Sequence, residues 1–126
     1  MKIAQSIVLR EASIGPYMLE LTLADGTFIQ IESRWSIHDS NHGAEKEWYA
    51  DEGEEVLKYV RKLIGVQVLE IRIDERVGGM VIKFANGIDI RVPADVNFEA
   101  WNLHRKDGTM LVSLPGGEVS KWLPSA

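Results

Sequence analysis

Residues 80–92 read MVIKFANGIDIRV, in which two alternating apolar runs flank an Asn-Gly pair. This alternation predicts two half-buried strands, and Asn-Gly is a strong signal for a turn between them. A two-residue loop would place Ile82 opposite Arg91, whereas a three-residue loop places it opposite Ile90. Only the second register keeps the apolar side chains on one face, so we expect a three-residue loop with a left-handed glycine.

The same hairpin pattern recurs along the chain. An Asp-Gly pair separates apolar runs at residues 25–26 and again at residues 107–108. Trp35 and Trp101 follow the first hairpin of each half at matching places. We interpret the two halves as an internal repeat of two related β units. The repeat covers approximately residues 5–50 and 66–122, with an insertion in the second copy around residues 93–95.

Between the two units, residues 51–64 have the pattern of one amphipathic helix. Asp51 and Glu54 form a variant of the capping box, and Gly65 is a typical residue after the last turn. The apolar residues at helical spacing are Val56, Leu57, Val60, Leu63 and Ile64. We therefore expect an α+β fold in a single domain, residues 1–126, in which this helix joins two related antiparallel β units.

The composition bounds the class of protein. The chain has 126 residues, of which 45% are hydrophobic and 26% charged, and it has no cysteine. A disulfide framework, a thiolate metal site and a cysteine nucleophile are therefore excluded. No stretch of the sequence approaches the roughly 20 apolar residues of a membrane span. We expect a cytoplasmic protein with no membrane partner.

The acidic residues are concentrated in one segment. Seven acidic residues and one lysine lie between Asp39 and Glu55, while the net charge of the whole chain is only −5. Such a segment repels nucleic acid and favours a basic protein partner. Trp48 and Tyr49 lie within it, and both residue types are common anchors in protein–protein interfaces. The predicted partner-binding residues are Glu45, Glu47, Trp48, Tyr49, Asp51, Glu52 and Glu55.

Two readings without a partner also fit this segment. Charge runs of this kind are common on solvated loops and helix starts. Trp48 could equally be a strand residue that covers a sheet.

A metal site is a second hypothesis for function. His38, Asp39 and His42 lie close together in sequence, and imidazole and carboxylate groups bind divalent metals. His104 would join them if the two units pack by pseudo-symmetry. The segment reads as a loop and has no HExxH-type motif, so we expect neither a metal nor another cofactor, and no catalytic residue.

The second half of the chain resembles a known family. Residues 98–103 read FEAWNL, residues 114–118 read LPGGE, and Trp122 follows. With the turn at residues 86–87, this order resembles a family of small uncharacterised bacterial proteins with a domain of unknown function. The resemblance covers roughly residues 60–122 and rests on turn and core residues. It brings no catalytic residues with it.

Some relatives in this family lie beside polymorphic toxin genes, in the position of immunity proteins. The resemblance therefore implies a non-catalytic, immunity-type protein that neutralises a toxin by covering a basic surface. We expect a monomer or a weak homodimer. A structural domain that packs on a copy of itself is a third hypothesis.

Overall fold

The computed structural model describes residues 1–3, 6–15, 18–42, 46–49 and 54–124, with only the backbone at residues 42 and 46–49. The strands of the first half are β1 (Lys2–Ile3), β2 (Ile7–Ile14), β3 (Leu19–Leu23), β4 (Phe28–Ile31), β5 (Ser36–Asp39) and β6 (Lys46–Tyr49). A short 3-10 helix, Ser40–His42, follows β5, and one α-helix, α1 (Glu54–Leu63), follows β6. The strands of the second half are β7 (Gln67–Ile73), β8 (Met80–Phe84), β9 (Ile88–Val92), β10 (Trp101–His104), β11 (Met110–Ser113) and β12 (Val119–Trp122).

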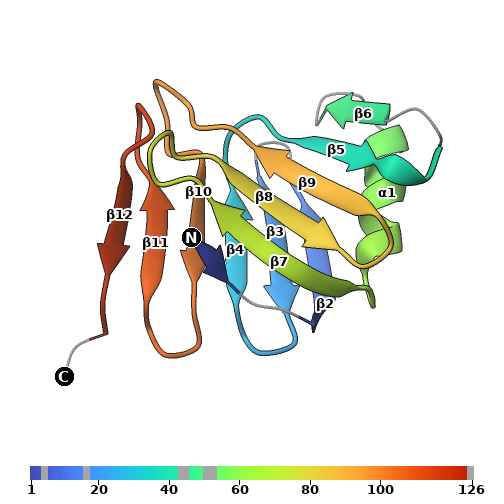
Figure 1. Cartoon of the computed structure of the whole chain (residues 1–126), viewed down its shortest axis with the longest axis horizontal. Coiled ribbons are helices and arrows are strands. Elements are labelled where there is room, and N and C mark those ends of the chain that lie inside the picture. The colour runs from blue at the N-terminus through green and yellow to red at the C-terminus, as the bar shows by residue number, and fades with distance from the viewer. Residues whose placement is uncertain (4–5, 16–17, 43–45, 50–53, 125–126) are drawn as a thin grey trace.

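The strands form one antiparallel sheet that folds over into two layers. The strand order is β12-β11-β10-β4-β3-β2-β7-β8-β9-β5-β6, and β1 pairs with β7 beside β2. In Figure 1, β7, β8 and β9 pass in front of β2, β3 and β4. We call the strands β1 and β5 to β9 the front layer, and the strands β2 to β4 and β10 to β12 the back layer.

The two halves of the chain exchange strands between the layers. After the β2-β3-β4 meander, β5 does not pair with β4 but crosses to β9 in the front layer. After the β7-β8-β9 meander, β10 crosses in the opposite direction and pairs with β4. Each layer therefore contains strands from both halves, and neither half can complete a layer by itself.

The two crossing strands, β10 and β5, pair with their new neighbours in equivalent registers. Leu103 of β10 lies opposite Ile29 of β4, and Ile37 of β5 lies opposite Ile90 of β9. A register shift interrupts β2 after Leu9 and β7 after Val68. The two halves thus have equivalent strand order, pairing and irregularities.

The predicted hairpin registers are confirmed. Leu21 lies opposite Ile29, and Ile82 lies opposite Ile90. Gly87 has φ +86°, which is the left-handed conformation that the three-residue loop requires.

The hydrophobic core lies between the layers and under the helix. Leu21 and Ile29 of the back layer, Ile82 and Ile90 of the front layer, and Val60 of α1 belong to one buried cluster. The apolar period of 2 along the strands places these side chains on the inner face of each layer. Most residues on the outer faces are polar or charged, and many of them, such as Arg72 and Gln30, are exposed or half-buried.

The expected α+β class is wrong, because the protein is predominantly an antiparallel β fold. In the described part of the chain one α-helix is present, α1 (Glu54–Leu63), and it packs against β2 and β6 at one end of the sheet. The expectation gave the helix the role of joining the two β units. In the structure β2 pairs directly with β7, so the sheet itself joins the two halves.

Candidate functional site

The acidic surface lies where β6 meets α1. β6 is the last strand in the sheet order, and α1 packs against it. Glu54 and Glu55 form the first turn of α1, and both side chains are exposed. We call this surface, residues 46–49 with Glu54 and Glu55, the β6–α1 edge.

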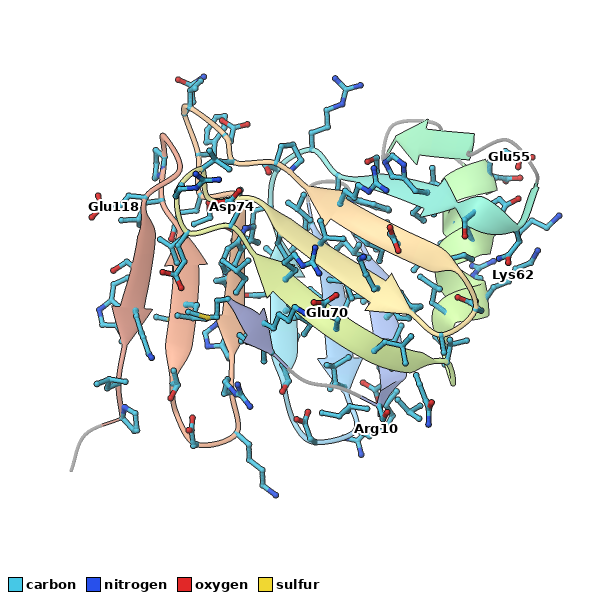
Figure 2. All side chains as sticks on the ribbon, in the orientation of Figure 1. Arg10, Glu55, Lys62, Glu70, Asp74 and Glu118 are labelled. Atoms are coloured by element: carbon cyan, nitrogen blue, oxygen red, sulfur yellow. The ribbon has the colours of Figure 1, made fainter. Side chains whose placement is uncertain are left out.

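The helix has opposite charges at its two ends. Arg61 and Lys62 lie in its last turn and are exposed. Figure 2 shows Glu55 and Lys62 projecting from opposite ends of α1. This arrangement is favourable with the helix dipole, and it places the negative charge at the end next to β6.

The structure describes the predicted partner-binding residues only in part. In the backbone register Glu47, Trp48 and Tyr49 lie opposite His38, Ile37 and Ser36. The side chains of these three β6 residues lie outside the described part of the chain. The residues Glu45, Asp51 and Glu52 also lie outside it.

Asp39 does not belong to the accessible acidic surface. It is only 3% exposed, and its Oδ1 accepts hydrogen bonds from the backbone N (2.9 Å) and Nδ2 (3.0 Å) of Asn41. The carboxylate therefore fixes the turn after β5, which is a common role for aspartate. Asp39 is one of the seven acidic residues counted in this segment, but its carboxylate is not part of the accessible surface.

His38 and His104 do not come together, and the side chain of His42, the other histidine of the metal hypothesis, lies outside the described part of the chain. His38 lies in β5 of the front layer, where its Nε2 is 3.2 Å from Ser36 Oγ. His104 lies in β10 of the back layer, where its Nε2 is 2.8 Å from Asn102 Oδ1. Pseudo-symmetry places these two rings in different layers. Within the described ranges, no group of three His, Cys, Asp or Glu residues could hold a metal ion, so the metal hypothesis gains no support there.

A groove on the outer face of the front layer was missed by the sequence analysis. Arg34, Arg72 and Arg91 line it, and its volume is about 730 Å³. Arg72 of β7 and Arg91 of β9 occupy polar positions in strands whose residues alternate between buried and more exposed. Only the pairing of β7, β8, β9 and β5 brings these positions into one row. No local sequence signal marks them.

Ion pairs order the charged side chains of this outer face. Arg72 lies 3.1 Å from Glu70, and Lys2 lies 3.4 Å from the same carboxylate. Burial raises the pKa of the Glu70 carboxyl, but hydrogen bonds and charges from Arg72 and Lys2 outweigh burial and hold this pKa below its ordinary value. Glu70 therefore stays ionised and holds the stem of Arg72 against the sheet.

Glu32 has the opposite pKa shift. Burial and, to a smaller extent, the charge of Glu99 raise the pKa of its carboxyl above 4.5. Its backbone N donates to Ala100 O at 2.9 Å, which holds the two acidic segments together. Burial and the charge of Glu99 both disfavour the ionised form of Glu32 in the folded chain, so the ionised carboxylate of Glu32 opposes folding at neutral pH.

Glu32→Gln is expected to raise the Tm by about 1–2 °C at pH 7, because it removes a carboxylate whose ionised form is disfavoured by burial and by the charge of Glu99. A raised folded-state pKa means that the folded chain binds a proton before the unfolded chain does. The penalty therefore shrinks as pH falls through the raised pKa, and the gain should vanish below about pH 4. Thermal unfolding of wild type and Glu32→Gln between pH 7 and about pH 4 measures this gain in Tm. The control is Glu75→Gln, at an exposed acid. A gain of equal size at every pH would contradict this explanation.

These features define a class of small antiparallel β protein, with strands exchanged between two related halves and charged outer faces. The chain belongs to a family of unknown function, DUF6188, whose model matches residues 6–123. The expected membership of a family of unknown function is thereby confirmed, over a longer range than the resemblance covered. No curated protein and no solved structure is significantly similar to the chain. Within the described residues no helix is long and apolar enough to cross a membrane.

Proposed function

We propose that the chain is a non-catalytic, cytoplasmic binding protein of the immunity type, which neutralises a toxin by covering a basic surface of it. The observation that carries this proposal is the packing of α1 on β6, with Glu54 and Glu55 exposed beside an edge strand. The remaining acids of the segment, Glu47 and Glu52 among them, adjoin these two in sequence.

The β6–α1 edge combines two features of a protein-binding surface. A terminal strand presents one side of its backbone away from the sheet, and such an edge can pair with another chain. Clustered carboxylates speed the encounter with a cation-rich partner and reject partners of like charge. Tyr49 belongs to the same strand and would supply apolar contact area, whereas the backbone of Trp48 lies opposite the buried Ile37.

The charge distribution along α1 gives the encounter a direction. Arg61 and Lys62 occupy the far end of the helix, so a basic partner is attracted at the β6 end and repelled at the other. A preformed surface of this kind inhibits by occlusion, which requires no reaction and no cofactor.

The test is affinity capture from the native host with charge-reversed variants. Glu54→Lys with Glu55→Lys should reduce the recovery of the captured partner by more than about tenfold, because attraction becomes repulsion. The control is Glu75→Lys with Glu118→Lys, which makes the same change of net charge at two exposed acids elsewhere. Figure 2 shows Glu118 on the opposite side of the molecule from Glu55. Equal recovery with both double variants would show that the β6–α1 edge does not bind the partner.

A further inference from the structure

The groove on the outer face of the front layer is built from a row of side chains across four strands. Arg72 of β7 lies opposite Val81 of β8, which lies opposite Arg91 of β9, which lies opposite Ser36 of β5. Directly opposed residues share one face of a sheet. The two arginines therefore flank Val81 on the same face, and Arg34 joins them from the loop before β5.

Both strand arginines are held over the sheet yet remain accessible. Arg72 pairs with Glu70 at 3.1 Å and Arg91 with Asp89 at 3.3 Å, each two residues back on the same strand. The arginine side chains are 50% and 42% exposed, whereas the two carboxylates are only 17% and 23% exposed. A guanidinium has five N–H donors, so an ion pair can orient it while it also binds a ligand.

The rest of the groove is mainly apolar. Val81 lies between the arginines, and Val77 and Pro93 also line the groove. Val77 is 60% exposed, so apolar surface is available to a ligand. A volume of about 730 Å³ lies within the usual range of small-molecule sites, which combine apolar walls with a few placed polar groups.

The polar groups of the lining select the sign of the ligand. Among the described side chains, three arginines and one carboxylate, Asp74, line the groove. Asp74 Oδ1 accepts a hydrogen bond from the backbone N of Arg76 at 3.0 Å, so this carboxylate helps to fix the β7–β8 turn. Arg72 and Arg91 already pair with Glu70 and Asp89, so the groove offers an anion the further N–H donors of these guanidinium groups and not unpaired charge. Guanidinium groups match the planar oxygens of carboxylate and phosphate groups.

The pseudo-symmetry of the fold provides an internal control. The equivalent row on the outer face of the back layer is Ser13, Glu20, Gln30 and Asn102. The backbone pairing is the same in both rows, but this second row contains no arginine. The fold therefore does not require arginine at these positions, and the cationic row is a property of one face.

We propose that this groove is a binding site for an organic anion, with an apolar body on Val77, Val81 and Pro93 and its oxygens on Arg72 and Arg91. The ligand class is a carboxylate, sulfonate or phosphate attached to an apolar group. This site adjoins the β6–α1 edge, because Ser36 and His38 line the groove and lie opposite Tyr49 and Glu47 of β6. Its ligand is a small molecule, so the inference goes beyond the proposed function.

Titration of the full chain with anilinonaphthalene sulfonate, an apolar dye that carries one anionic group, tests the proposal. We expect saturable binding, and we expect Arg72→Gln and Arg91→Gln each to weaken it by about fivefold or more. Arg61→Gln, at an exposed arginine of α1, should change it by less than about twofold. Phenylnaphthylamine, which has the same aromatic body without the sulfonate, should bind wild type and variants equally weakly.

The proposal is overturned if the sulfonate dye binds Arg72→Gln and Arg91→Gln as tightly as wild type. Binding at exposed apolar residues elsewhere, such as Phe98 or Trp122, would give that result. It is also overturned if phenylnaphthylamine binds as tightly as the sulfonate. Unchanged Tm values for the variants show that the fold is intact. No protein partner takes part, so failure here leaves the proposed toxin binding untouched.

Discussion

Gly78→Ala is expected to lower the free energy of unfolding by more than about 3 kcal/mol and the Tm by more than about 10 °C. Gly78 has φ +80°, and a Cβ there would collide with the backbone of Gly117. No flexible side chain can give way, because Gly117 itself faces the Val77 carbonyl. A shift would also disturb the Gly78 carbonyl, which accepts hydrogen bonds from Trp101 Nε1 and Ser113 Oγ, both at 2.9 Å.

The matched control is Gly116→Ala. Gly116 has a similar φ of +90°, but nothing lies within 4 Å of the position of its Cβ. Gly116→Ala should therefore lower the free energy of unfolding only by the cost of placing an alanine in the left-handed conformation, about 1–2 kcal/mol. Thermal and denaturant unfolding followed by circular dichroism measure both variants. Equal losses for the two would contradict the backbone contact between the β7–β8 and β11–β12 loops.

The two halves of the chain, residues 1–64 and 65–126, are each expected to lack a cooperative unfolding transition as separate monomers. Strand β4 of the first half pairs with β10 of the second half, and β9 of the second half pairs with β5 of the first half. Separation also removes the pairing of β2 with β7. Each half would expose the inner face of its own meander to water, at a cost larger than the stability of a typical domain.

Mixing the two halves in equal amounts should restore the β-sheet signal and a single transition. Circular dichroism and size measurement of each half, and then of the mixture, give the comparison. A monomeric half that unfolds cooperatively without its partner would show that the exchange of strands is not essential to the fold.

Local pairing could be predicted from the sequence because it depends on neighbouring residues. The registers of Leu21 with Ile29, Ile82 with Ile90, and Leu103 with Leu111 all follow from loop length and apolar alternation. A shift of one residue would have turned every apolar side chain to water. The pattern therefore permits only one register in each hairpin.

The exchange of strands between the layers could not be predicted from the sequence. Either β5 or β10 could pair with β4, because the two strands have the same apolar pattern. Ile37 of β5 and Leu103 of β10 are equivalent residues, and both are fully buried. Either could complete the row that contains Ile29. Sequence periodicity does not distinguish these partners, since both choices bury the same kind of side chain.

The candidate sites were predictable to different degrees. The acidic segment is continuous in sequence, so its charge could be recognised before its position was known. Asp39 was nevertheless misassigned to the surface, because its hydrogen bonds to Asn41 depend on the turn geometry. Arg72 and Arg91 come together only through the pairing of β7, β8 and β9, so their groove has no sequence signature.

The rate of association of the captured partner with the purified chain tests the proposed binding surface most directly. We predict that Glu54→Lys with Glu55→Lys lowers the association rate constant by about tenfold at low salt and by much less at high salt, since salt screens charge attraction. Tyr49→Ala should instead speed dissociation. An association rate that is the same for wild type and the reversed variant at low salt would contradict the role of the β6–α1 edge.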